Sequence, residues 1–274
     1  MNIKLIVCDI DGTLTDHESR IPRNNILALR AARNSGIRIA LCSGRQAADM
    51  ELIAEILGMD DIFILSLNGS YCLEAPKGKL YYNRTLDTHA LWKCISCFEE
   101  KDLAFNCFSG NVLINNITPE YEKDPTFWNA ERQARRKLIT HLYGMEHVRH
   151  YAKIGINKLT YVDLYDFDKL RHIKDEMRTI KEVDITSSWR CNFEIMPKGV
   201  HKGSAVSALA TRLGIEKEQI LAFGDNENDI PLFCCVKHSV CMENGTEEAK
   251  RNARHLTLSN ENAGIAYFLN KNVL

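Results

Sequence analysis

Residues 1–67 alternate between short apolar runs and segments with helical spacing. The run Lys4–Val7 is dominated by leucine and β-branched residues, which is typical of a strand buried on both faces. Because the links between these segments are short, the pattern predicts a parallel, doubly wound sheet with right-handed crossovers. The predicted strands are Lys4–Val7, Ile37–Leu41 and Ile62–Leu67, and the predicted helices are Pro22–Asn34 and Gln46–Leu57, followed by Gly36 and Gly58.

The same alternation returns near the end of the chain. Lys202–Leu213 has helical spacing and is followed by Gly214, and Ile220–Phe223 is a short apolar run. We therefore expect both ends of the chain to build one α/β sheet. The further predicted elements are the strands Val236–Met242 and His255–Thr257 and the helices Thr246–Asn252 and Asn262–Asn270.

The middle of the chain mixes helices with neighbouring strands, which is typical of an α+β unit. We predict an α/β core domain of residues 1–84 and 197–274, with an inserted α+β cap domain of residues 85–196. The predicted helices of the insertion are Thr88–Glu100, a polar stretch around Asn129–Leu142, and Asp168–Ile180. Its predicted strands are Leu103–Cys107, Val112–Asn115, Lys158–Val162, Asp184–Ser188 and Cys191–Met196.

Composition excludes some classes of partner. The 274 residues are 45% apolar and 26% charged with a net charge of −1, which gives no electrostatic reason to expect a nucleic acid or an anionic membrane. The N-terminal apolar run is too short for a signal sequence, and no run approaches the roughly 18 apolar residues of a membrane helix. We expect a cytosolic protein whose 10 cysteines are reduced.

Two features each have two interpretations. Cys94 and Cys97 have CxxC spacing and could form a zinc site with His147 and His150. However, the chain has no second CxxC, and both cysteines fall in a predicted helix, which favours ordinary packing. The basic stretch Arg132–Lys137 is typical of a solvated helix face, with a phosphate or partner contact as the alternative.

The first predicted strand is followed by Asp9-Ile10-Asp11-Gly12-Thr13. Ligand sites in open α/β sheets lie beyond the carboxyl ends of the strands. Two carboxylates two residues apart repel each other unless a cation is bound, and oxygen ligands suit Mg²⁺. Gly12 allows a sharp turn of the backbone. The simpler alternative is a strand-end turn with capping acids.

Three further segments carry polar groups at comparable positions. Ser43-Gly44 follows a predicted strand and offers a hydroxyl and backbone N–H groups to an anion, or is an ordinary helix N-cap. Lys202 begins a helix and can neutralise a phosphoryl charge, or is simply solvated. Asp225 and Asp229 lie four residues apart at a turn into a helix, with the donor Asn228 between them, and the alternative there is an acidic turn.

All four segments fall at one edge of the predicted sheet. Together they supply a nucleophile, a neighbouring acid–base group, a hydroxyl, a lysine and a metal carboxylate. These are the groups that phosphoryl transfer requires. Their convergence argues against four unrelated turns.

The four segments resemble, in order, the four motifs of the haloacid dehalogenase superfamily. The matching residues, motif by motif, are Asp9 and Asp11, then Ser43, then Lys202, then Asp225 with Asp229. The insertion resembles the large α/β cap of the Cof-like phosphatases. The phrases Leu67-Asn68-Gly69, Glu194–Val200 and Met242-Glu243-Asn244-Gly245 are also similar to that group. The resemblance therefore covers nearly the whole chain.

By this resemblance, Asp9 attacks phosphorus and forms an aspartyl-phosphate, while Asp11 protonates the leaving alcohol and then activates water. The implied ligands of Mg²⁺ are the Asp9 carboxylate, the Asp11 backbone carbonyl and the Asp225 carboxylate. The groups expected at the phosphate are Gly12, Ser43, Gly44, Lys202 and Asn228. Asp229 is expected to orient the groups around the ligands.

The implied function is Mg²⁺-dependent hydrolysis of small phosphomonoesters, with sugar phosphates as the expected substrates. Alternatives are a phosphatase of phosphoglycolate or another small metabolite, a phosphomutase, and a catalytically silent binding module. Asp11 favours a phosphatase or phosphomutase, because dehalogenases and P-type ATPases that resemble this motif lack the second aspartate.

Some positions depart from the Cof-like pattern or are open in role. His255 and Ala263 stand where many Cof-like chains have aspartate, and Glu243 stands where glycine is common, but none of the three is a predicted catalytic position. The candidate substrate contacts of the insertion, each with a structural role as the alternative, are Asn157, Lys158, Arg190 and Asn192. The sequence predicts no oligomeric state.

Overall fold

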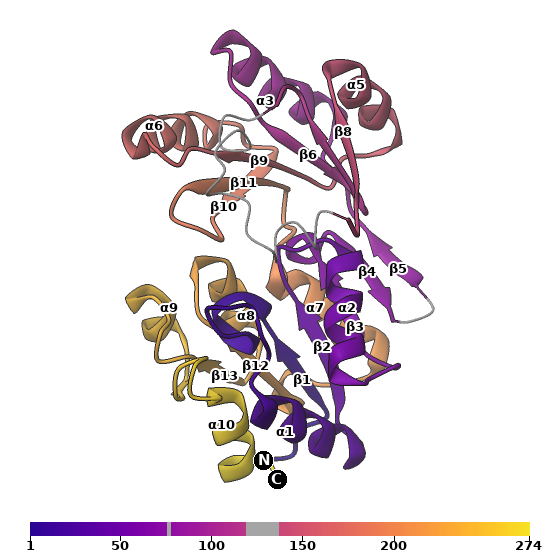
Figure 1. The fold of residues 1–274 in the computed structure, drawn as a ribbon, viewed down its shortest axis with the longest axis vertical. Coiled ribbons are helices and arrows are strands. Elements are labelled where there is room, and N and C mark those ends of the chain that lie inside the picture. Colours follow the sequence, from indigo (N-terminus) through magenta and orange to yellow (C-terminus); the bar gives the residue numbers. More distant parts are fainter. Residues whose placement is uncertain (76–77, 119–136) are drawn as a thin grey trace. The chain divides into compact units, whose positions relative to one another are not determined.

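The computed structural model describes residues 1–75, 78–118 and 137–274. The chain forms two compact units, one of Met1–Tyr82 together with His201–Leu274, and one of Asn83–Val200. Figure 1 shows that the first unit combines the indigo N-terminal part with the orange and yellow C-terminal part. The predicted insertion of residues 85–196 lies inside the second unit, and its role as a cap stays a prediction.

Eight strands of the described ranges form the sheet of the first unit, in the order β14-β13-β12-β1-β2-β3-β4-β5. The strands from β14 to β3 run parallel, which confirms the predicted α/β class. The strand order reverses at β1, and such a switch point is where open sheets of this class bind ligands. The strands are β1 (Leu5–Cys8), β2 (Arg38–Cys42), β3 (Phe63–Ser66), β4 (Tyr71–Glu74), β5 (Lys79–Asn83), β12 (Ile220–Gly224), β13 (His238–Cys241) and β14 (His255–Leu256).

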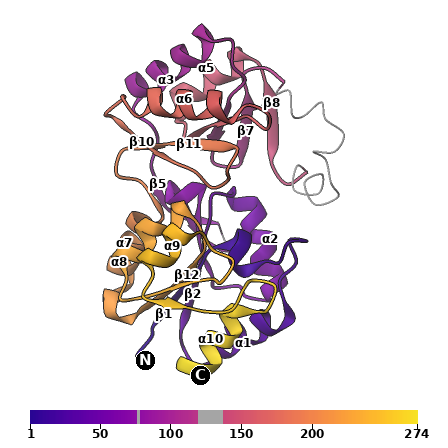
Figure 2. The ribbon, with the colours of Figure 1, turned by 90° about the vertical axis from the view of Figure 1, so that its left-hand side faces the viewer.

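Helices cover both faces of this sheet, because its strands are apolar on both sides. Ile6 and Cys8 of β1 face the core formed with α1, α2 and α10, whereas Leu5 and Val7 face the core formed with α7 and α8. Figure 2 shows α1 and α10 side by side near both chain ends. The helices are α1 (Arg23–Asn34), α2 (Ala47–Leu57), α7 (Lys202–Leu213), α8 (Ile230–Cys235), α9 (Glu247–Asn252) and α10 (Gly264–Asn272).

One edge of the sheet departs from the purely parallel prediction. Strand β4 runs antiparallel to β3, with Tyr71 opposite Ser66, and β5 lies beyond it at the edge. The residues of β5 are exposed or half-buried, so this strand lacks the apolar run by which the buried strands are recognised. An antiparallel edge strand on an otherwise parallel sheet is common in large α/β sheets.

The second unit places six described strands in the order β10-β11-β9-β6-β7-β8. Along β9, Leu159 and Tyr161 pack into the core beneath α3, α5 and α6, while Lys158 and Thr160 alternate to the other face. Its elements are α3 (Thr88–Glu100), β6 (Asn106–Ser109), β7 (Val112–Asn115), β8 (Thr140–Tyr143), α5 (Met145–Ile154), β9 (Lys158–Val162), α6 (Phe167–Met177), β10 (Val183–Thr186) and β11 (Asn192–Pro197). No described helix of either unit is long and apolar enough to cross a membrane.

The polar stretch predicted as helical, Asn129–Leu142, lies mostly outside the described residues. Its described end is not helical, because Thr140–Tyr143 forms strand β8 and pairs in parallel with β7. Pairing with a neighbouring strand overrides the weak helical tendency of this polar segment. The basic stretch Arg132–Lys137 also falls outside the described residues, apart from Lys137.

A substitution of Phe98 tests the packing of the second unit. Its ring is fully buried and stacks on Phe105, with the ring centroids 5.1 Å apart, and on Tyr161. Phe98→Ala leaves a cavity and should lower the free energy of unfolding by about 3–5 kcal/mol, measured by urea denaturation. Ile154→Ala, at an exposed position of α5, is the control and should change it by about 0.5 kcal/mol or less. Equally small effects would contradict this core.

Candidate active site

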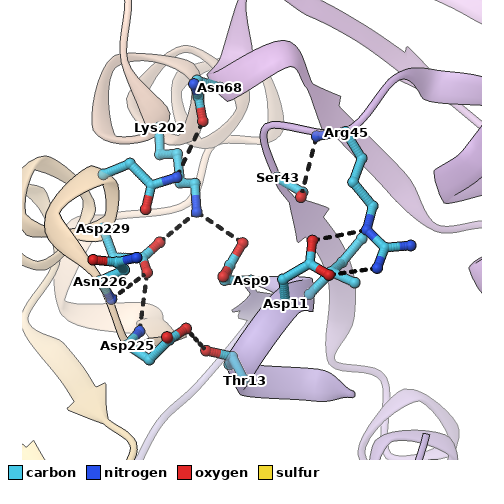
Figure 3. A network of polar contacts seen from close by, with 12 residues as sticks. Asp9, Asp11, Thr13, Ser43, Arg45, Asn68, Lys202, Asp225, Asn226 and Asp229 are labelled. Carbon is cyan, nitrogen blue, oxygen red and sulfur yellow. Dashed lines mark hydrogen bonds and ion pairs between the residues drawn. The ribbon is translucent and has the colours of Figure 1, made fainter. Parts of the chain in front are cut away.

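Three of the predicted segments meet at the carboxyl ends of neighbouring parallel strands. Asp9 follows β1, Ser43 follows β2 and Asp225 follows β12. Cys8, the last residue of β1, pairs with Leu41 and Phe223, each one residue before the end of its strand, so the three strands end at adjacent points. Figure 3 shows these residues around one site, together with Lys202 and Asp229. The predicted convergence of the four segments is therefore present in the structure.

The turn after Asp9 lies against Asp225. Gly12 has a φ of +76°, and a Cβ atom there would lie 2.5 Å from Asp225 Oδ2, so a side chain is excluded. Thr13 Oγ1 donates to Asp225 Oδ1 at 2.7 Å, and Asn244 Nδ2 donates to the Gly12 carbonyl at 2.8 Å. Sequence reasoning gave Thr13 and Asn244 no role, although both stand inside segments that resemble the family.

Lys202 is the cation of the site. Its side chain is fully buried, and its Nζ lies 2.7 Å from Asp9 Oδ1 and 2.6 Å from Asp229 Oδ1. Burial alone would lower the pKa of this ammonium, but the carboxylates of Asp229 and Asp9 outweigh it and raise the pKa above the ordinary value. Lys202 is therefore charged and held between two acids, and the alternative of a solvated lysine is excluded.

The carboxylates outnumber this lysine. With Asp9, Asp225 and Asp229 ionised, three negative charges face one positive charge, which leaves −2. Burial raises the pKa of Asp9 well above its ordinary value, and Asp229 and Asp225 add to this against the opposing effect of Lys202. Burial and then Asp229 raise the pKa of Asp225 to about 7, although Thr13 donates to it. Lys202 thus neutralises only part of the negative charge of the site.

This donor set fits a hard divalent cation. One carboxylate oxygen from each of Asp9, Asp225 and Asp229 lies within 4.8 Å of the others. Asp229 is already engaged, because its Oδ1 contacts Lys202 and its Oδ2 accepts from the backbone N–H groups of Asp225 and Asn226. Asp9 and Asp225 are then the carboxylates best able to bind a metal, and Asp229 orients its neighbours. Oxygen donors of this kind suit Mg²⁺.

The Asp11 side chain points toward Arg45. Its carboxylate forms a two-point ion pair with the Arg45 guanidinium, with Nε–Oδ2 at 2.8 Å, and its side chain is 58% exposed. Arg45 is itself buried and also lies 3.3 Å from Asp49, in the first turn of α2. Figure 3 shows the Asp11–Arg45 pair. Sequence reasoning gave Arg45 no role.

The remaining predicted phosphate contacts lie on either side of these acids. Ser43 is buried, and its Oγ accepts from the Arg45 backbone N–H at 3.3 Å, in the turn that Gly44 also forms. Asn228 is buried in the turn after Asp225, where its Nδ2 donates to Asn68 Oδ1 at 3.3 Å. Asn68 was another residue without a predicted role. The contacts of these residues with a phosphate stay predictions.

The candidate substrate contacts of the insertion all have structural partners within the second unit. Lys158 Nζ forms a buried ion pair with Glu194 at 2.8 Å and lies over the Phe108 ring. Asn157, Arg190 and Asn192 also make contacts there, with Gly110, Phe167 and Trp189 respectively. These contacts favour the structural interpretation of all four residues.

The CxxC pair is also explained by packing. Cys94 is fully buried in the core of the second unit, and Cys97 contacts Glu176 and Lys101. Among the residues that the structure describes, the only cluster of histidine, cysteine or acidic side chains with metal-ligand spacing is the aspartate group of the first unit.

The charge imbalance predicts how pH changes stability. In metal-free protein Asp225 keeps its proton up to about pH 7, whereas in the unfolded chain it titrates near about pH 4. The folded state therefore binds more protons in this window, so stability falls as the pH rises through it. The melting temperature in EDTA should fall between about pH 5 and 7.5, and Mg²⁺ should raise it most at the upper end.

Asp225→Asn is the matched control for this measurement. It keeps the shape of the side chain but removes one charge, so both the slope and the Mg²⁺ response should shrink. An identical pH slope and Mg²⁺ response in the two proteins would contradict the assignment of Asp225.

The chain is similar to several known proteins along nearly its whole length. A family profile described as haloacid dehalogenase-like hydrolase matches residues 6–269. The 5-amino-6-(5-phospho-D-ribitylamino)uracil phosphatase YwtE of Bacillus subtilis is 29% identical, over 98% of this chain and 98% of its own. Phosphatase YwpJ of the same organism is 26% identical, over 97% and 99%. The solved structure of a haloacid dehalogenase-like hydrolase from B. subtilis has a TM-score of 0.87 at 24% identity and covers 99% of this chain and 100% of its own.

The profile match spans nearly the whole chain, and the two relatives cover 98% and 97% of it. The resemblance to the Cof-like phosphatases and the predicted enzyme class, a phosphoric monoester hydrolase, are thereby confirmed. The fold of the solved structure agrees with the predicted combination of a parallel α/β core and an insertion. The chain belongs to the haloacid dehalogenase-like hydrolase family.

Proposed function

We propose that this protein is a Mg²⁺-dependent phosphatase that hydrolyses small phosphomonoesters, with sugar phosphates as the preferred class. The observation that carries the proposal is the buried cluster in which Lys202 bridges Asp9 and Asp229 beside Asp225. Such a cluster holds a carboxylate nucleophile, a phosphate-neutralising cation and a metal site at the switch point of the sheet. The cytosolic location expected from the sequence stays a prediction.

The reaction proceeds in two displacements. In the first, an Asp9 carboxylate oxygen attacks phosphorus, the bond from phosphorus to the ester oxygen breaks, and Asp11 gives the leaving alcohol its proton. In the second, Asp11 takes a proton from water, which attacks phosphorus and releases inorganic phosphate and free Asp9. The supporting geometry is the position of Asp9 at the end of β1, with Lys202 Nζ 2.7 Å from it.

Other residues prepare the site for a phosphoryl group. Lys202 and Ser43 hold its oxygens, and the backbone around Gly12 and Gly44 and the amide of Asn228 complete the contacts. The Asp9 and Asp225 carboxylates and the Asp11 carbonyl would hold Mg²⁺. When bound, the ion offsets the repulsion between the phosphate and the carboxylates.

The ion pair of Asp11 with Arg45 adds a requirement to this scheme. The guanidinium contacts both Asp11 carboxylate oxygens, so the side chain is held in the direction of Arg45. Asp11 therefore acts only after its side chain leaves Arg45. The backbone of Asp11 does not need to move, because it is the carbonyl, not the carboxylate, that is assigned to the metal.

The name of one relative indicates a class of substrate. YwtE is named as a phosphatase of a phosphorylated ribityl compound, in which a sugar-derived alcohol carries the phosphate. We infer the same general class, a phosphorylated polyol or sugar, for this chain. Phosphoglycolate and other small metabolites are the alternatives within the phosphatase reaction.

A metabolite panel with Mg²⁺ tests the proposal. We expect phosphate release, with at least one sugar or polyol phosphate above phosphoglycolate. Asp9→Asn should lower kcat by on the order of 1,000-fold or more, and Asp11→Asn by about 100-fold or more. Asp168→Asn, an exposed acid of the second unit, is the control and should leave kcat unchanged.

The same assay separates the alternatives. Transfer of phosphate to a second hydroxyl, seen by product analysis, would indicate a phosphomutase. Ligand binding without turnover would indicate a silent module. Undiminished activity of Asp9→Asn would refute the assigned nucleophile.

A further inference from the structure

The turn Leu67–Gly69, directly after β3, has an unusual backbone. Leu67, Asn68 and Gly69 have φ values of +49°, +54° and +90° in succession. Glycine and asparagine tolerate this left-handed region, but a leucine there adopts a rare and unfavourable conformation. Strained backbone of this kind persists only where the surrounding structure enforces it, and it is common at functional sites.

The backbone of this turn holds the turn between β2 and α2. The Leu67 N–H donates to the Arg45 carbonyl at 2.9 Å, and the Asn68 N–H donates to the Ser43 carbonyl at 2.8 Å. Both N–H groups donate to the turn between β2 and α2 because Leu67 and Asn68 both have left-handed φ values. These hydrogen bonds thereby fix the position of Ser43 at the carboxyl end of β2.

The third residue of the turn lies against α7. A Cβ atom on Gly69 would lie 2.4 Å from Ala205 Cβ and 3.2 Å from the His201 carbonyl, so only glycine allows this approach. Lys202 begins the same helix. The turn is thus packed against the element that carries the lysine of the site.

The Asn68 side chain reaches a further segment. It is 1% exposed, and its Oδ1 accepts from Asn228 Nδ2 at 3.3 Å. Figure 3 shows the Asn68 side chain among the residues of this network. An amide nitrogen carries two hydrogens, so engaging one of them fixes the direction of the other. Asn68 is therefore in a position to aim the remaining N–H of Asn228.

We propose that Asn68 is a positioning residue of the phosphoryl site, which sets the orientation of the Asn228 amide through its side chain while its backbone holds Ser43. The inference rests on the proposed function, which assigns Asn228 and Ser43 to phosphoryl oxygens. It goes beyond that function by giving a role to the strained turn. Asn68 acts through its neighbours and needs no contact with the substrate.

Asn68→Gly is the most direct variant. Glycine removes the amide but accepts the left-handed backbone at least as well as asparagine, so folding should be preserved. We expect the inhibition constant of inorganic phosphate, measured at saturating Mg²⁺, to rise about tenfold, the effect of one misdirected hydrogen bond to a charged group. The melting temperature should fall by at most about 4 °C, because one buried hydrogen bond is lost.

Three further variants separate positioning from a structural effect. Ser19→Gly makes the same change at another residue with positive φ outside the site, and it should leave phosphate inhibition unchanged. Asn228→Ala should raise the inhibition constant by a similar factor. In the double variant of Asn68 and Asn228, the constant should be no higher than in Asn228→Ala alone, because the two residues act as one unit.

The outcomes are decisive. An unchanged inhibition constant in Asn68→Gly, or effects that multiply in the double variant, would overturn the proposal. If Asn68→Gly does not fold, Asn68→Ala removes the same amide, keeps a Cβ atom in the buried position at the cost of a left-handed alanine, and carries the same expectation. Absence of phosphatase activity in the unaltered protein would instead refute the proposed function, so the two failures are distinguishable.

Discussion

The structure around the site depends on one buried lysine. Lys202 lies between Asp9 and Asp229, and without its charge two carboxylates would be buried unpaired, which costs several kcal/mol. Even with it, Asp9 and Asp225 are short of positive charge, since burial raises the pKa of both. This deficit of positive charge destabilises the metal-free site and favours the binding of a divalent cation. The proposed function uses the deficit to bind Mg²⁺ and a phosphate.

The backbone makes this cluster by close approach. Gly12 lets the turn after β1 lie against Asp225, and Gly69 lets the turn after β3 lie against α7. Asp9 itself follows β1, the strand at which the sheet order reverses, so segments from both ends of the chain converge there. The reactive side chains lie in short segments of the sequence. Contacts between residues far apart in the sequence hold these segments together.

Sequence reasoning predicted the parts that are encoded locally. Helix Lys202–Leu213 and strand Lys158–Val162 have the predicted bounds, because apolar periodicity and Gly214 mark them. The Asp11–Arg45 pair was not predictable, since a rotamer depends on a partner 34 residues away. Strand β8 was also missed, because its pairing with β7 overrides its local tendency. The roles of Asn68 and Asn244 depend on contacts that no spacing encodes.

Capture of the covalent intermediate tests the central claim, that Asp9 is the nucleophile. Asp11→Asn should form the intermediate from p-nitrophenyl phosphate, whose phenolate leaves without a proton, but should hydrolyse it slowly for lack of a base. Acid quenching and peptide mass spectrometry should then find phosphate on Asp9, and none after the added change Asp9→Asn. Phosphate on another residue, or turnover that persists without Asp9, would contradict the account.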